Sequence, residues 1–214
     1  MENNMDTEKK KFFSTKMIVQ LAMFFALTIL MQVLAFTLPA IGGVSFTFSL
    51  VPLVLGGIYF GKQENKFIGI WVGAFLGLLF AILTCFDALR GGMTTFLFTN
   101  RPFLTIITCL TKGILAGLIP AVVFKFLYKK NSYIAVILAA ISAPIVNTGI
   151  FIIFMFIMIN TVKDFMGANQ LGENVVYFLF IGCAGINFIV EVIINVVVSP
   201  GIFIVQKAVD KNSV

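Results

Sequence analysis

Charged side chains are scarce in this chain of 214 residues, and histidine is absent. Asp, Glu, Lys and Arg make up 11% of the residues, against roughly 25% in an ordinary soluble domain. A surface facing water cannot be built from so few charges, so lipid must cover most of the molecule. The sequence also lacks a GxxxxGK[ST] phosphate loop and paired carboxylates, which argues against an ATPase or a metalloprotease, and it predicts no catalytic residue.

Cysteine is rare as well. The three cysteines, Cys85, Cys109 and Cys183, lie within or at the ends of apolar segments and form no CxxC pair. This spacing predicts neither a disulfide framework nor a metal site, and no cofactor is expected. The net charge of +6 comes from short basic clusters beside apolar segments, where such residues set topology, so no nucleic-acid partner is expected.

Long apolar runs are what the chain has in abundance. Hydrophobic residues make up 60% of it, and stretches such as residues 134–159 are apolar on every helical face, whereas a β-barrel strand would alternate. Crossing a hydrocarbon core takes roughly 20 helical residues. We therefore predict an all-α integral membrane protein with six transmembrane helices. Their expected ranges are 17–38, 44–60, 67–85, 103–126, 133–160 and 175–205.

The distribution of Lys and Arg predicts the orientation in the membrane. Eleven of the 15 basic residues fall on one side: Lys9, Lys10, Lys11, Lys16, Lys62, Lys66, Lys125, Lys129, Lys130, Lys207 and Lys211. The opposite side holds Arg90, Arg101 and Lys163. The positive-inside rule then places both termini in the cytoplasm. We expect cytoplasmic tails over 1–16 and 207–214 around one membrane domain over 17–206, in the cell membrane.

Two connections on the opposite side are of interest. The segment 39–45 carries no charge, and residues 86–102 are expected to form the longest polar loop, a candidate lid. Within the third helix, Gly69, Gly73, Gly77 and Ala81 recur every four residues. Such a stripe of small side chains predicts close approach of another helix.

Charges inside the predicted helices point to a site. A charge near the bilayer centre costs roughly 2.5–3.5 kcal/mol on insertion scales and usually serves a function. Lys112 and Glu191 each lie near the middle of a helix, so they could neutralise each other, bind substrate or do both. Asn187 and Glu191 share a helix face with Asn195, and Asn147 could face them from the fifth helix. Interhelical hydrogen bonding is the alternative to ligand binding for these asparagines.

Three basic residues could hold an anion. Arg101 and Lys112 are eleven positions apart, about three helical turns, and would share a face if the fourth helix extended back to Arg101. Together with Arg90 they could grip a small carboxylate, although a solvated loop charge is the alternative for Arg90. We count Asn100, beside Arg101, among the candidate substrate-binding residues.

The first helix presents two small side chains one turn apart, Ala22 and Ala26, where another helix could dock closely. With its six short helices, its basic N-terminus and this Ala-x-x-x-Ala pair, the chain resembles the substrate-binding S components of energy-coupling factor (ECF) transporters. The segment FTFSLVPLVLGGIYFG, residues 46–61, is similar to the second helix of that family. The segment TKGILAGL, residues 111–118, is similar to its fourth helix.

This resemblance implies both a docking surface for a partner subunit and a pocket for a substrate. It implies that Ala22 and Ala26 dock a transmembrane coupling subunit driven by two cytoplasmic ATPases. It also implies an extracellular pocket formed by helices four to six and closed by the segments 39–45 and 86–102. The loaded subunit would tip over in a bacterial plasma membrane and release a vitamin into the cytoplasm.

The substrate implied is a small vitamin bearing a carboxylate. The chain looks most like the pantothenate-type branch, while riboflavin, folate, niacin and biotin remain open. A self-sufficient secondary transporter or channel is the alternative function, for which an inverted repeat or a row of acidic residues would argue, and neither is evident. A membrane enzyme that uses only Ser, Lys or Glu is a third hypothesis.

Overall fold

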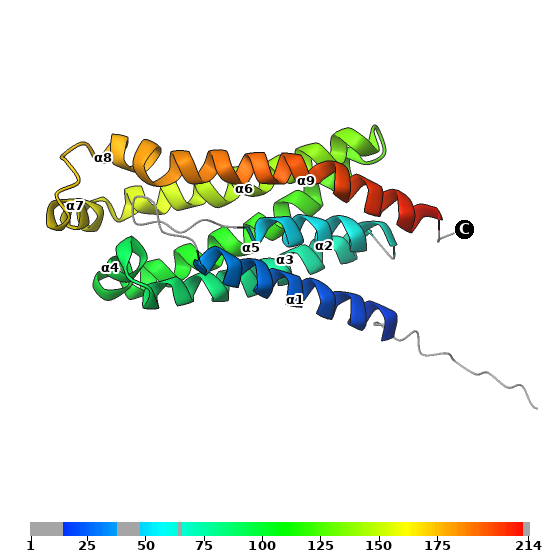
Figure 1. Ribbon diagram of the computed structural model, residues 1–214, viewed down its shortest axis with the longest axis horizontal. Helices are drawn as coiled ribbons and strands as arrows, with labels where there is room; N and C mark the ends of the chain where they lie inside the picture. Colours follow the sequence, from blue (N-terminus) through cyan, green and yellow to red (C-terminus); the bar gives the residue numbers. More distant parts are fainter. Residues whose placement is uncertain (1–14, 38–47, 64–65, 212–214) are drawn as a thin grey trace, which may run out of the picture.

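The computed structural model describes residues 15–37, 48–63 and 66–211, and over these residues the chain is a bundle of helices (Figure 1). No strand occurs among the described residues. The longer elements are α1 (Thr15–Thr37), α2 (Leu50–Gln63), α3 (Lys66–Cys85), α5 (Pro102–Leu127), α6 (Ser132–Ile157) and α9 (Ile186–Lys211). The shorter ones are η1 (Phe86–Leu89), α4 (Gly92–Asn100), α7 (Ile159–Ala168), α8 (Val175–Tyr177) and η2 (Phe178–Gly185).

Within the described part of the chain, five helical stretches are long and apolar enough to cross a membrane. They are Thr15–Thr37, Phe67–Cys85, Pro102–Leu127, Ser132–Ile157 and Val175–Val198. The second predicted span, 44–60, corresponds to the shorter apolar helix Leu50–Lys62. The all-helical membrane class is therefore confirmed, while six complete crossings and the orientation of the termini stay predictions.

The short helix α2 lies at the centre of the bundle. Leu50, Leu53, Val54 and Phe60 are each fully buried, and α2 packs against α1, α3, α5, α6 and α9. A helix that is apolar on all sides is normally buried by its neighbours. Protein therefore surrounds much of α2, although its sequence alone is typical of a lipid-facing span.

Glycine brings α3 and α5 into backbone contact. A Cβ atom built on Gly117 would lie 2.0 Å from the carbonyl oxygen of Gly73, and one built on Gly77 would lie 2.4 Å from that of Gly113. No side chain fits at such distances, so the two helices can pack this closely only where both carry glycine. The prediction of a close helix contact along the stripe of α3 is confirmed.

The two ends of the bundle differ. Figure 1 shows α4, α7 and α8 gathered at one end, whereas α1 begins and α9 ends at the other. The polar loop predicted over residues 86–102 is wrong as a structural assignment, because most of it is helical in η1 and α4. These short helices pack on the ends of the longer ones, and tertiary packing stabilises helices of this length.

Some expectations concern residues outside the described ranges, and another concerns the end of the last helix. The segment 39–45 and residues 1–14 of the predicted tail lie outside the described residues. At the other end, α9 continues to Lys211, five residues beyond the predicted domain end at 206. The helix before it, η2, is a π-helix, a rare conformation that is often found near functional sites.

Candidate functional site

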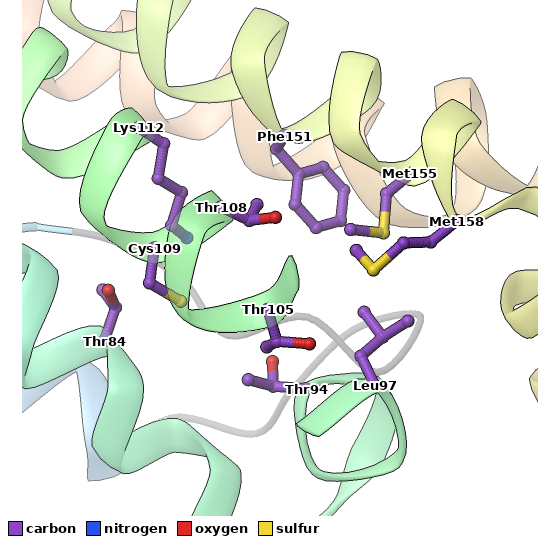
Figure 2. A pocket seen from close by; sticks show the side chains of 10 residues that line it. All are labelled: Thr84, Thr94, Leu97, Thr105, Thr108, Cys109, Lys112, Phe151, Met155 and Met158. Carbon is purple, nitrogen blue, oxygen red and sulfur yellow. The ribbon is translucent and has the colours of Figure 1, made fainter. Parts of the chain in front are cut away.

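A cavity opens near the α4 end of the bundle, between α3, α4, α5 and α6 (Figure 2). Its volume is about 30 Å³, and it is partly open to solvent. Its lining combines polar and apolar side chains: Thr84, Thr94, Leu97, Thr105, Thr108, Cys109, Lys112, Phe151, Met155 and Met158. Ligand pockets commonly have this composition, an apolar wall with a few polar groups that fix orientation.

The polar wall of the cavity comes mainly from one face of α5. Thr105, Thr108 and Lys112 are spaced by three and four residues, so their side chains project from the same side of the helix. Thr84 of α3 and Thr94 of α4 add two further hydroxyl groups. Figure 2 shows the side chains of Thr94 and Thr105 opposite each other. The half-buried Lys112 is the one charged residue in this lining.

The apolar wall faces the threonines. It consists of Phe151 and Met155 from α6, Met158 directly after α6, and Leu97 from α4 (Figure 2). Methionine side chains are flexible and adapt their shape to what they contact. The cavity therefore offers an ammonium group, hydroxyl groups and an adaptable apolar surface, which suits a small amphipathic anion.

A second cavity adjoins the first. It is lined by Arg101, Leu104, Ile157, Met158, Asn160 and Thr161, and it shares Met158 with the first cavity. The helix α5 begins at Pro102, and Arg101 has non-helical backbone angles. The helix therefore does not extend back to Arg101, which was the condition for placing Arg101 and Lys112 on one continuous helix face. Arg101 instead lies at the junction of α4 and α5, beside the first cavity.

Five of the predicted substrate-binding residues line neither cavity, and Arg90 and Asn100 are two of them. The guanidinium of Arg90 donates to the carbonyl oxygen of Phe36, and it lies 4.7 Å from the centre of the Phe36 ring. It thus connects the end of α1 to the segment before α4. The Asn100 side chain is exposed and donates to the carbonyl oxygen of Phe96 within its own helix at 2.8 Å.

The remaining polar candidates form a separate cluster between α6 and α9. Glu191 is 1% exposed, and the amide nitrogen of Asn147 lies 3.3 Å from both of its carboxylate oxygens. Asn187 donates to the same carboxylate at 3.1 Å, and Asn195 donates to the backbone carbonyl of Glu191 at 2.8 Å. Asn147 thus faces the asparagine and glutamate face of the last helix, which is what the four-residue spacing indicated.

Lys112 and Glu191 occupy different environments. Lys112 lines the threonine cavity, whereas the recorded hydrogen bonds of the Glu191 side chain come from Asn147 and Asn187. Direct pairing of Lys112 with Glu191, which their similar depth suggested, stays a prediction.

Sequence reasoning missed the threonines. Hydroxyl side chains are common in membrane helices, where they bond to their own backbone, so a single threonine carries little signal. The spacing of Thr105 and Thr108 relative to Lys112 could have found them, because it places all three on one face. Thr84 and Thr94 come from other helices, and no pattern in the sequence connects them to Lys112.

On the outside of the bundle, the side chains of Ala22 and Ala26 lie on the surface of α1. Larger exposed apolar side chains flank them along the same helix, including Ile18, Met23 and Val33. The Ala-x-x-x-Ala pair therefore lies on an exposed, apolar face of α1. Within the described residues, no group of three His, Cys, Asp or Glu side chains could hold a metal ion.

The fold and the cavity together define an integral membrane protein suited to binding a small solute between its helices. Comparison with protein families matches residues 16–203 to the family described as ECF transporter, substrate-specific component. The chain belongs to this family. Its members are subunits of transporters in the cell membrane and work with a transmembrane coupling subunit and ATPases to take up a small molecule. The searches of curated proteins and of solved structures returned no match.

Proposed function

We propose that this chain is the substrate-binding subunit of an ATP-driven importer for a small carboxylate-bearing vitamin such as pantothenate. The observation that carries the proposal is the position of Lys112, whose side chain lines a cavity inside the membrane domain among hydroxyl and apolar groups. An ammonium group at a site only partly open to water favours an anion, because its charge is screened less there than in bulk solvent.

The orientation of the chain supports uptake from outside. If the basic clusters place both termini in the cytoplasm, the cavity lies toward the extracellular side, since it is at the end of the bundle away from the termini (Figure 1). Arg101, at the adjoining cavity, is then placed to attract the anion at the entrance.

The other candidate residues have less direct roles in this proposal. Arg90 holds the segment that precedes α4 against α1, so it positions one wall of the cavity. Asn147, Asn187 and Glu191 form a polar cluster beyond the described lining, and we infer that they meet the inner end of a bound substrate. Nothing in the placement of Asn100 supports contact with substrate.

The test is equilibrium binding to the purified chain in detergent. Calorimetry with pantothenate, biotin, folate, nicotinate and riboflavin identifies the ligand, and we expect one of the carboxylates to bind. Replacing Lys112 with methionine keeps the length of the side chain and removes its charge. We expect Lys112→Met to weaken binding about thirtyfold or more, because it removes one partner of a buried charge contact.

The matched control is Lys163→Met, which removes an exposed charge from α7. It should leave the affinity unchanged within about twofold. Unaltered binding by Lys112→Met would rule out the proposed contact, and tight binding of riboflavin alone would rule out the carboxylate.

A further inference from the structure

The threonine hydroxyl groups of the cavity are already oriented by the backbone. Thr105 donates its hydroxyl hydrogen to the carbonyl oxygen of Arg101 at 2.9 Å, and Thr108 donates to that of Leu104 at 2.7 Å. On the facing helix, Thr84 donates to the carbonyl oxygen of Ala81 at 2.9 Å. A hydroxyl group has one hydrogen to donate and two lone pairs that accept. These three groups therefore present acceptor oxygens to the cavity.

Lys112 supplies the complementary chemistry. Its ammonium group has three N–H donors and no acceptor. The polar side of the cavity thus offers donors at Lys112 and acceptors at the threonines. A ligand that satisfies both must carry an anionic or acceptor group at one position and hydrogen-bond donors at another.

The polar cluster around Glu191 also has an excess of hydrogen-bond acceptors. The side-chain oxygens of Asn147, Asn187 and Asn195 are buried and have no hydrogen-bond partner. Their amide nitrogens are directed instead to the carboxylate or the backbone of Glu191. Unpaired buried acceptors are uncommon and costly in folded proteins, so donors are what this interior lacks.

We propose that the substrate is an acid that also bears hydroxyl or amide N–H groups, with its carboxylate at Lys112 and its donors on the threonine oxygens. The inference rests on the proposed function and narrows it. An acid without donors, such as nicotinate, leaves the threonine oxygens unpaired in a cavity that it dehydrates, so it binds more weakly.

The experiment compares ligands that differ only in their donors. Binding of pantothenate is measured by calorimetry beside that of an analogue in which both hydroxyl groups are replaced by hydrogen, with biotin and nicotinate as further acids that have and lack donors. We expect the acid that binds most tightly to carry donors. Loss of the pantothenate hydroxyl groups should lower the affinity at least about tenfold.

Threonine variants show where the donors are recognised. Thr105→Val and Thr108→Val keep the side-chain shape and remove the acceptor. Each should weaken binding of pantothenate about three- to tenfold and change binding of the analogue without hydroxyl groups much less. Thr99→Val is the matched control, because Thr99 makes the same type of bond, to the carbonyl oxygen of Thr95, on an exposed face outside the cavity.

The outcomes separate the two proposals. If nicotinate or the analogue without hydroxyl groups binds as tightly as the donor-bearing acid, the inference is overturned and the importer for a carboxylate stands. Folded threonine variants that weaken the binding of pantothenate and of this analogue by the same factor, or that weaken neither, overturn it as well. If the wild-type chain binds no acid at all, the proposed function itself fails.

Discussion

Two charged residues inside the membrane-spanning helices are held in different ways. Lys112 is half-buried beside hydroxyl groups in a cavity that solvent can reach. Glu191 is almost fully buried, and two asparagine amides from α6 and α9 donate to its carboxylate. A charge in an open cavity is available to a ligand, whereas a charge enclosed by amide donors also contributes to the packing of the two helices.

At the scale of single residues, removing Asn147 tests this packing. Asn147→Ala deletes a donor to a buried carboxylate, and such bonds contribute about 1–2 kcal/mol. We expect the midpoint of thermal unfolding in detergent, without ligand, to fall by about 2–8 °C. Asn100→Ala removes an exposed asparagine that bonds only within its own helix turn, so its midpoint should match that of the wild type. Equal midpoints for the two variants would contradict a structural role for Asn147.

At the scale of helices, the contact between α3 and α5 depends on the absence of side chains. Gly117→Ala would place a methyl group 2.0 Å from the carbonyl oxygen of Gly73, so the helices must separate. We expect this variant to lose about 1–3 kcal/mol of stability, measured by thermal or denaturant unfolding in detergent.

The control for this substitution lies in another helix. A Cβ atom at Gly149 of α6 meets no atom within 4 Å. Gly149→Ala should therefore be neutral or stabilise the chain by up to about 1 kcal/mol, because alanine is the better helix former. If both variants lose the same stability, the close packing of α3 and α5 is not the cause.

The sequence predicted the long helices well because length and continuous hydrophobicity are properties of a segment by itself. Observed and predicted ends of α3 and α5 agree within one residue. The sequence did not predict α4, because Thr94, Thr95 and Asn100 are poor helix formers and only contacts with distant segments stabilise their helix. The cavity was out of reach for the same reason, because four separate helices supply its lining and only the threonine spacing of α5 is visible in sequence.

At the scale of the whole molecule, the outer face of α1 predicts how the chain associates with its coupling subunit. Ala22→Trp puts a bulky ring on the exposed alanine pair, which prevents close approach of another helix, and should abolish co-purification of the coupling subunit and the ATPases. Vitamin binding by the isolated chain should be unaffected, because Ala22 is on the outer surface. Ile153→Trp on α6 is the matched control, since Ile153 is also an exposed apolar residue. If the Ala22→Trp variant still co-purifies with all partners, docking takes place elsewhere.

The glycine contact between α3 and α5 also bears on whether ions can leak across the membrane through this chain. Between Lys112 and the end of the bundle where α1 begins, α3 and α5 touch backbone to backbone, at Gly77 with Gly113 and at Gly73 with Gly117. Ions cannot pass a seam in which not even a methyl group fits. A vesicle that contains only this subunit should therefore keep its proton and sodium gradients when the vitamin is added outside, and electrical recordings should show no current.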